Sequence, residues 1–505
     1  MSDNQQATGT TEMKRGIQGW QVAFIGLGGV IGSCYFLGMG IVIHDMGPSV
    51  IIAFGVVGVI VYGLMIAYAE LLVNLPRRGT FVAYTSEFLG PSISTGFGWA
   101  FWFNWVCYVP SESIAVSTII TALFGISDNH VAYIAIAIAA LCAITIINLA
   151  SVDAFARIES GLAITKCIVI IVFIILAFCI WIGLIGSGHF LGTEVNFPDG
   201  FGTGKDWFPN GGMVILTNMT VVLVTFQGTE IVGLTAAEAQ NPDESVPKAC
   251  RSVTYRIVLL YLVPIILILL IFPFGLASDE NAVFADVMIY YHMPILGKIF
   301  GAVVLVAAFS CSNTGFYGTV RALFGLSIEG LAPEWLSHTN NQGNPRKAVL
   351  FTLAFMWVVL ILGLISETTG LMENLYASLL SMSGFTGTVA WVGICASWTV
   401  FRRKYVQRGY DVKKLRAKVP NGQGWLPWFS IISQIFCLAM MAADVSQLPV
   451  FFMSCGAIFI PMIVHHFLYK AGKTRDINAL NSDEKTFDEA YPPLEGSIAA
   501  KQNNG

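Results

Sequence analysis

Charged residues are scarce in this chain. Asp, Glu, Lys and Arg make up 11% of its 505 residues, whereas 55% are hydrophobic, and the mean hydropathy is +0.70. Because soluble domains carry about a quarter charged residues, this composition excludes a water-soluble protein and indicates an integral membrane protein. The net charge of −4 therefore says little about partners. We expect the lipid bilayer to surround the chain, and no nucleic-acid partner.

A cleavable signal peptide, a disulfide framework and a metal site are also missing from the pattern. Residues 1–15 are polar, and the apolar run that follows is too long for a signal-peptide core. No two of the ten cysteines share a metal-site spacing, and the seven histidines are scattered. The cysteines are interpreted as small apolar residues. We expect no metal and no resident cofactor.

The chain contains instead about twelve apolar runs, each close to the twenty residues that a membrane-spanning helix needs. We place these spans at about 18–43, 48–73, 93–124, 131–150, 161–187, 211–238, 253–276, 294–328, 347–366, 373–400, 427–445 and 448–470. The predicted fold is an all-α integral membrane protein. Residues 1–15 and 471–505 are predicted to be polar tails, the first disordered and the second solvated.

Lysine and arginine fall almost entirely on one side of these spans, which is the cytoplasmic side by the positive-inside rule. The basic positions on that side include 14–15, 77–78, 157, 248–256, 346–347, 402–418 and 470–475. The opposite loops carry only Lys205 and Lys298. Both termini are therefore predicted to be cytoplasmic. The run 402–418 is interpreted as an orientation signal on an anionic leaflet, with a specific partner site as the alternative.

The first span is crowded with glycine over residues 26–40. Gly28, Gly29 and Gly32 make this helix easy to open, and an opened helix inside a bilayer must line a cavity or be buried in protein. The alternative is that the glycines only allow neighbouring helices to approach closely. On this stretch alone the two interpretations are equal.

A second polar, glycine-containing interruption at residues 224–233 decides between them. It lies in span six, which corresponds to span one if spans one to five (16–190) and six to ten (211–400) form two inverted repeats. Transporters built from inverted repeats place their site at two such broken helices. Matching breaks therefore favour a transport site. A basic cytoplasmic loop (401–426) and two further spans (427–470) complete the predicted organisation.

The two breaks offer complementary backbone groups. A half-helix that starts after a break attracts an anion, and Gly32, Ser33 and Cys34 would supply its N–H donors. A half-helix that ends before a break presents carbonyls that suit an ammonium group, here those of Val30 and of residues 225–226. An anion site beside a cation site matches the zwitterionic backbone of an amino acid. Phe226 is interpreted either as a thin gate over the substrate or as a core residue.

Three charged residues inside the spans are functional candidates by default. Glu112 follows Pro110 in span three, and Glu230 lies inside the second break, where it can fix the backbone or meet a cationic side chain. Lys166 lies about six residues, or roughly 9 Å, into span five. Either it snorkels back to the cytoplasm, or burial allows it to load and release a proton. Ser310, Ser312, Asn313 and Thr314 are its possible neighbours.

These residues resemble those of the amino acid permeases of the amino acid–polyamine–organocation superfamily, in the amino acid transporter branch. The resemblance covers about residues 15–470. It rests on these strings: Gly28-Gly29-Val30-Ile31-Gly32-Ser33, Ala69-Glu70-Leu71, Phe226-Gln227-Gly228-Thr229-Glu230 with Ala236-Ala237-Glu238, Asn241-Pro242, Val246-Pro247-Lys248-Ala249, Ser312-Asn313 through Tyr317 and Arg321, and Pro345-Arg346.

The resemblance implies a leucine-transporter-type fold, with two inverted five-helix repeats, two further helices, and spans 1 and 6 broken. It implies that Gly32 and Ser33 bind the substrate carboxylate, that carbonyls near Val30 and Thr225 bind the amine, and that Lys166 occupies the place of a sodium ion. Three positions depart from the usual pattern, namely Cys34, Tyr35 and Val224. All three alter the pocket.

We therefore expect a membrane transporter, and not an enzyme, that takes up amino acids by proton-coupled symport with the proton as coupling ion. The predicted substrate-binding residues are Val30, Gly32, Ser33, Cys34, Glu112, Thr225, Phe226, Gln227, Gly228 and Glu230, and Lys166 is the predicted proton-coupling residue. The string Phe226-Gln227-Gly228-Thr229-Glu230 looks most like that of lysine permeases, which favours basic substrates. Neutral or aromatic substrates, an exchanger, and a non-transporting amino acid sensor remain alternatives. Glu230→Gln is predicted to lose basic substrates selectively, and an equal loss of all substrates would make Glu230 structural.

Overall fold

A computed structural model describes residues 29–77, 79–148, 152–185, 196, 207–234, 242–277, 282–340, 344–369, 375–472, 474, 485–495 and 497–499. Within these ranges all regular secondary structure is helical. The α-helices are α2 (Met39–Met46), α3 (Val50–Asn74), α4 (Thr80–Leu89), α5 (Pro91–Phe124), α6 (His130–Asn148), α7 (Val152–Trp181), α9 (Met213–Thr217), α10 (Met219–Val224), α11 (Ile231–Leu234), α12 (Pro242–Ile271), α13 (Val283–Tyr290), α14 (Pro294–Ile328), α15 (Arg346–Thr368), α16 (Leu375–Gln407), α17 (Leu426–Met441), α18 (Leu448–Lys470) and α19 (Phe487–Ala490).

Eight helical segments of the described chain are long and apolar enough to cross a membrane. They are Cys34–Asn74, Pro91–Phe124, His130–Asn148, Gly161–Trp181, Pro294–Ile328, Arg346–Thr368, Leu375–Gln407 and Val445–Lys470. Two shorter apolar segments, Val258–Ile271 and Leu426–Met441, lie in α12 and α17. The protein is therefore a multi-pass membrane protein. The twelve predicted spans are more than these eight segments for three reasons: Cys34–Asn74 contains parts of spans one and two, span six is divided into α9, α10 and α11, and spans seven and eleven contain the two shorter segments.

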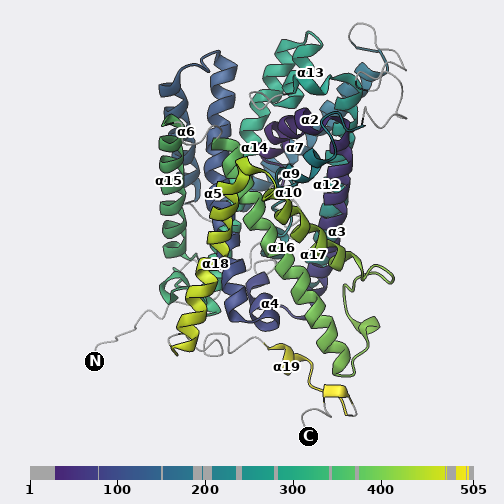
Figure 1. Cartoon of the computed structure of the whole chain (residues 1–505), viewed down its shortest axis with the longest axis vertical. Helices are drawn as coiled ribbons and strands as arrows, with labels where there is room; N and C mark the ends of the chain where they lie inside the picture. The colour runs from purple at the N-terminus through teal and green to yellow at the C-terminus, as the bar shows by residue number, and fades with distance from the viewer. Residues whose placement is uncertain are drawn as a thin grey trace, which may run out of the picture.

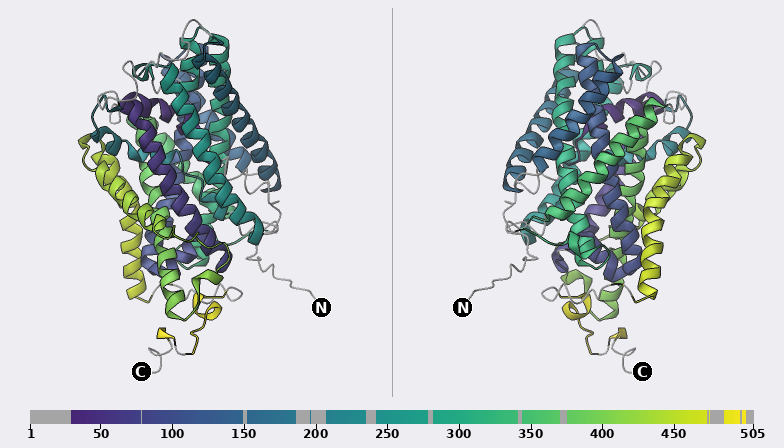
Figure 2. Two further views of the ribbon diagram at one scale, coloured as in Figure 1. Left: turned by 90° about the vertical axis from the view of Figure 1, so that its right-hand side faces the viewer. Right: turned by 90° about the vertical axis from the view of Figure 1, so that its left-hand side faces the viewer.

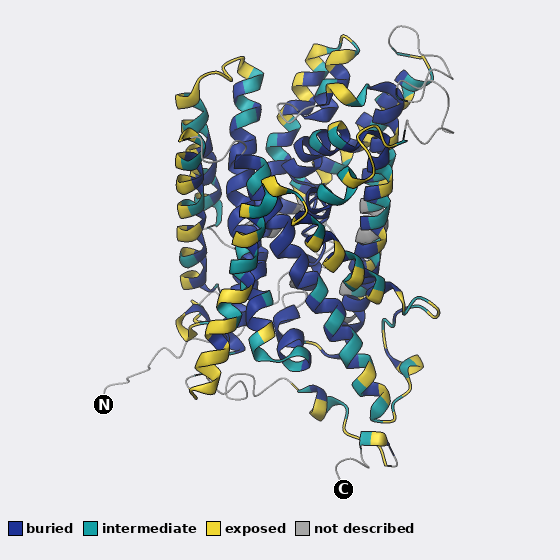
Figure 3. Ribbon diagram, in the orientation of Figure 1, coloured by how far each residue is buried: buried dark blue, intermediate teal, exposed yellow. Residues whose placement is uncertain are grey.

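Helices α5 and α16 form the centre of the bundle, and α6 and α18 its rim. The most apolar windows of α16 and α5 are 89% and 78% buried, against 22% for those of α6 and α18. Helix α5 packs against both α14 and α16, and Gly315 of α14 lies directly on the Trp105 ring of α5. In Figure 3 the central helices are mostly dark blue, which marks buried residues, whereas α6 and α15 carry yellow, exposed residues on their outward faces. Those outward faces are apolar, as contact with lipid requires.

Two short helices outside the predicted spans mark the two ends of the molecule (Figures 1 and 2). Helix α13 packs on α14 at one end, and α4 packs on α5 and α16 at the other. We call these the α13 end and the α4 end. Glu70 is fully buried near the α4 end, where Arg402 binds its carboxylate through Nε and Nη2, both at 2.7 Å. This ion pair connects α3 with the end of α16.

Two expectations about the C-terminal third are wrong. Helix α16 continues to Gln407, so the basic loop that is predicted to start at residue 401 starts later. The tail after residue 471 is not wholly solvated, because the Phe487 side chain is 0% exposed. It packs against Phe88 of α4 and Phe401 of α16.

Hydrogen bonds hold the same tail segment against the bundle. The Phe487 N–H donates to Glu87 of α4 at 2.5 Å, and Arg408 donates to the Tyr491 carbonyl at 2.6 Å. Burial raises the pKa of the Tyr491 hydroxyl, which donates to the Asn74 carbonyl at 2.7 Å. The aromatic and backbone groups of residues 487–491 therefore override the polar composition of the tail.

Candidate functional site

The described residues at both predicted interruptions, 29–32 and 225–230, are non-helical, and the two segments touch. Residues 29–32 form turns before a π-helical segment, Cys34–Gly38, and residues 225–230 form turns between α10 and α11. Residues 18–28 and 235–238 of these two predicted spans lie outside the described chain. Gly228 has a φ of +101°, and a Cβ atom there would overlap the Gly29 carbonyl oxygen. Only glycine allows this contact between the two breaks.

Three consecutive carbonyls of the first break each accept a hydrogen bond from a different helix. Gly29 O accepts from the Cys311 thiol of α14 at 3.0 Å, and Val30 O from the Tyr261 hydroxyl of α12 at 3.2 Å. Ile31 O accepts from Lys166 Nζ of α7 at 2.9 Å. The opened backbone is therefore buried in protein and satisfied by side chains, as an interruption at membrane depth requires.

The carbonyls predicted to bind an ammonium group converge on one atom. The Tyr261 hydroxyl lies 2.6 Å from Thr225 O and 3.2 Å from Val30 O. One carbonyl from each break is thus within hydrogen-bond distance of the same point. A hydroxyl that lies between two carbonyls marks a place where an ammonium donor fits.

The first N–H after the first break is presented as predicted, and a carboxylate accepts it. Ser33 N lies 3.0 and 3.1 Å from the two oxygens of Glu112 in α5. A Cβ atom on Gly32 would overlap both Glu112 and the Tyr108 hydroxyl, so this close approach also requires glycine. The Ser33 hydroxyl lies 3.0 Å from the Tyr376 hydroxyl, and the Cys34 thiol 2.9 Å from the Tyr108 hydroxyl.

The second break is fixed from within. Gly228 N lies 3.2 and 3.0 Å from the two oxygens of Glu230, and Trp391 Nε1 of α16 donates to Glu230 Oε2 at 3.0 Å. The Gln227 amide donates to the carbonyls of Ser383 and Gly384 at 3.2 and 3.1 Å. Both polar side chains of this break therefore bind protein groups.

Phe226 belongs to an aromatic cluster beside the converging carbonyls. Its ring stacks on Tyr261 with centroids 4.9 Å apart, and it lies 5.7 Å from Phe54. Tyr35 meets Tyr261 edge to face at 4.3 Å and lies 5.7 Å from Phe284 of α13. The cluster extends from the breaks towards the α13 end. Tyr35, where the family usually has a smaller residue, contributes an aromatic ring to it.

Lys166 is fully buried, so the snorkelling interpretation is wrong. Helix α7 begins at Val152, so Lys166 lies about 21 Å along the helix, although it is only roughly 9 Å into the span predicted from residue 161. The predicted neighbour Ser310 donates its hydroxyl to Glu159, a buried carboxylate of α7 that sequence analysis missed. Glu159 lies just before the predicted start of the span, and its spacing of seven residues from Lys166 was the available signal.

The structure brings the predicted residues of both breaks together with Glu112 and Lys166. Five residues around the site are not predicted from the sequence. Four of them are aromatic, namely Tyr108, Tyr261, Tyr376 and Trp391, and the fifth is the carboxylate Glu159. Tyr261 had a signal, because it is the one side chain with a polar group in the apolar segment Val258–Ile271.

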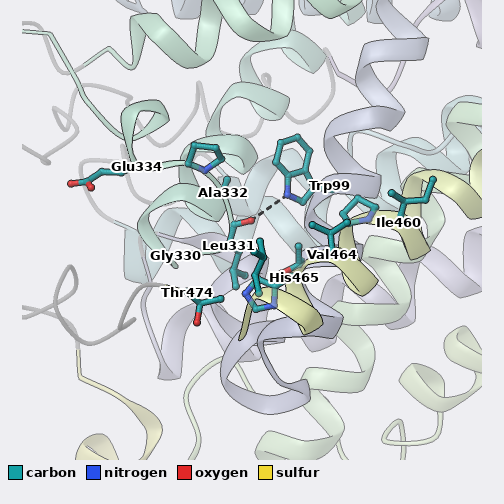
Figure 4. Close-up of a pocket in the computed structure, with 13 residues that line it drawn as sticks. Trp99, Gly330, Leu331, Ala332, Glu334, Ile460, Val464, His465 and Thr474 are labelled. Carbon is teal, nitrogen blue, oxygen red and sulfur yellow. Dashed lines mark hydrogen bonds between the residues drawn. The ribbon is translucent and has the colours of Figure 1, made fainter. Parts of the chain in front are cut away.

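A separate pocket of about 490 Å³ lies near the α4 end, between α5, α18 and the segment after α14 (Figure 4). Trp99, Leu331, Glu334 and His465 are among its lining residues, and the Trp99 indole donates to the Leu331 carbonyl at 3.3 Å. None of the predicted site residues lines it. The breaks and this pocket are therefore different places.

Comparison with known proteins identifies the family of the chain. The family model described as amino acid permease matches residues 21–478. The lysine-specific permease LysP of Lactococcus lactis is 34% identical over 82% of this chain and 81% of its own. The amino-acid permease RocC of Bacillus subtilis is 31% identical over 81% of this chain and 85% of its own. A D-serine/D-alanine/glycine transporter of Escherichia coli is 28% identical over 87% and 90%. These relatives are named as permeases and transporters, not enzymes, and the chain belongs to the amino acid permease family of the amino acid–polyamine–organocation superfamily.

Proposed function

We propose that the protein is a secondary active transporter that takes up amino acids across the cytoplasmic membrane by alternating access. The observation that carries this proposal is the contact between the two breaks. It brings the Ser33 N–H, which suits a carboxylate, close to the Val30 and Thr225 carbonyls, which suit an ammonium group. An amino acid backbone carries both of these charges.

In this proposal the substrate carboxylate takes the place of the Glu112 carboxylate on Ser33 N–H, and the substrate ammonium takes the place of the Tyr261 hydroxyl. Both positions already hold a group of the required hydrogen-bonding type. Phe226 then packs against the bound backbone. Glu230 and Gln227 act by holding the second break in shape rather than by binding the substrate side chain.

We further propose that uptake is coupled to a proton carried by Lys166. The Lys166 ammonium donates to Ile31 O, next to the carbonyl proposed to bind the substrate. Protonation and deprotonation of Lys166 would therefore change the hydrogen bonding of the first break directly. A buried amine also gives up a proton more readily than an exposed one.

Basic amino acids are the proposed substrates, and support comes from the lysine-specific relative. The D-serine/D-alanine/glycine transporter supports the alternative of a neutral substrate. We also propose twelve spans in a 5+5 inverted repeat plus two helices, with the α4 end and both termini in the cytoplasm. The basic residues gathered at the α4 end, including Arg77, Arg402 and Arg408, support that orientation.

Uptake of labelled amino acids into proteoliposomes under an imposed inward proton gradient tests the proposal. We expect accumulation by the wild type and its loss in Lys166→Ala, with lysine and arginine competing better than leucine or phenylalanine. Counterflow that does not need a gradient would indicate an exchanger. Binding without any transport would indicate a sensor and would contradict the proposal.

A further inference from the structure

We infer that Glu159 is the second proton site of the coupling path, which receives the proton from Lys166 and passes it towards the α4 end. The inference rests on the proposed coupling through Lys166 and extends it to a residue with no assigned role. Glu159 is 0% exposed, although it lies only seven residues after the start of α7. A buried carboxylate in a membrane helix is costly and is a functional candidate by default.

Glu159 and Lys166 lie on the same face of α7. A separation of seven residues is about two helical turns, or roughly 10 Å along the axis, which two long side chains can shorten. The charges of Glu159 and Lys166 act on each other, and the Glu112 charge acts on Lys166 as well. The other titratable groups that act on Lys166 are Cys311 of α14 and Cys167 of α7.

The two oxygens of the Glu159 carboxylate differ, because in the described chain one accepts a hydrogen bond and the other does not. The Ser310 hydroxyl of α14 donates to Oε1, and Asn313 and Thr314 lie beside the same carboxylate. Its second oxygen, Oε2, meets no donor at hydrogen-bond geometry in the part of the chain that the structure describes. A buried carboxylate oxygen without a donor is a natural place for a proton.

The proton balance is simple. Lys166 loses a proton from its ammonium group and Glu159 gains it, which leaves a neutral amine and a neutral carboxylic acid. The total charge of the two groups does not change, and two neutral groups are cheaper to hold in a low-dielectric interior than two charged ones. Glu159 then releases the proton to water at the α4 end.

The test compares gradient-driven accumulation with counterflow in Glu159→Gln, since Gln keeps an oxygen for Ser310 but cannot carry the proton. Counterflow moves the loaded carrier back and forth without releasing the proton. We expect accumulation to fall by about tenfold or more while counterflow stays at the wild-type rate. Thr165→Val, on the exposed face of α7, is the matched control and should keep both activities.

Equal losses of accumulation and counterflow would assign Glu159 a structural role and overturn the inference, as would no loss of either. If Glu159→Gln does not fold, Glu159→Asp decides. It keeps the titratable group, so we expect it to accumulate substrate, and its failure to do so with intact counterflow would contradict the inference. A wild-type protein without gradient-driven accumulation would instead refute the proposed function itself.

Discussion

In both breaks a backbone N–H meets both oxygens of a buried glutamate, but the two glutamates come from different places. Gly228 N is bound by Glu230, two residues further along the same break. Ser33 N is bound by Glu112, which belongs to α5 and is 79 residues away. Trp391 holds the Glu230 carboxylate from α16. The second break therefore carries its own partner, whereas the first depends on a side chain that another helix supplies.

We infer from this difference that the second break is structural and that the first break binds the substrate. In the proposed transport cycle, a local carboxylate fixed by a tryptophan would keep the second break in one shape. A carboxylate on a neighbouring helix can withdraw when that helix moves, and Pro110, two residues before Glu112, already interrupts the hydrogen bonds of α5. We therefore propose that the substrate carboxylate replaces the Glu112 carboxylate at the first break, while the second break keeps its shape.

The largest effect should come from Gly228→Ala. An alanine must adopt a φ of +101° and overlap the backbone of Gly29, which cannot move aside as a side chain can. We expect a loss of about 3 kcal/mol or more in stability and no transport, measured by thermal unfolding in detergent and by uptake. Gly32→Ala meets only side-chain ends, so it should fold and lose substrate affinity. Equal destabilisation by Gly228→Ala and Gly32→Ala would contradict the proposed difference between the two breaks.

Glu230→Gln should have the second-largest effect. The amide offers one acceptor oxygen, and its NH₂ group would face the Gly228 N–H or the Trp391 N–H, which are both donors. We expect uptake of all substrates to fall by a common factor of about ten. The pattern of competition between lysine and leucine should not change. Selective loss of basic substrates would show instead that Glu230 meets a cationic side chain.

Glu112→Gln should have a smaller effect of the opposite sign on binding. The substrate carboxylate would no longer compete with a negative charge for Ser33 N–H, so the apparent affinity should rise severalfold. The fold should remain intact, because Glu112 supports only the first break. Binding of labelled substrate to purified protein measures the change. A uniform loss as large as that of Glu230→Gln would place the two glutamates in the same structural role.

The smallest effect should come from Tyr261→Phe. The substitution removes the hydroxyl between Val30 O and Thr225 O but leaves both carbonyls and the stacking with Phe226 in place. Thermal unfolding should show a loss of about 1 kcal/mol, and the affinity for substrate should change little. Complete loss of substrate binding would mean that the hydroxyl itself binds the substrate.

The sequence predicts the positions of both breaks, because glycine beside polar residues in the middle of an apolar span weakens a helix at that point. It also predicts Glu112 and Lys166 as site residues, since charges inside spans are rare. It does not predict which group each of them binds, because that depends on how helices far apart in the chain pack. Sequence analysis misses Tyr376 and Trp391 for this reason.

Helix boundaries account for the remaining errors. Helix α7 starts nine residues before the predicted span at 161, since hydropathy detects the lipid-facing part of a helix and not its polar extension. Glu159 therefore falls outside the predicted span. The tail is predicted to be solvated because its composition is polar, although Phe487 and Tyr491 pack against the bundle.

The most direct test of the proposed site uses substrate analogues that lack one backbone charge. Uptake of the labelled amino acid is measured in competition with the unlabelled amino acid, with its decarboxylated amine and with its deaminated acid. If the first break binds the carboxylate and the paired carbonyls bind the ammonium group, neither analogue should compete at concentrations where the amino acid does. Competition by the decarboxylated amine as strong as by the amino acid would contradict the account, because Ser33 N–H would then have no role in recognition.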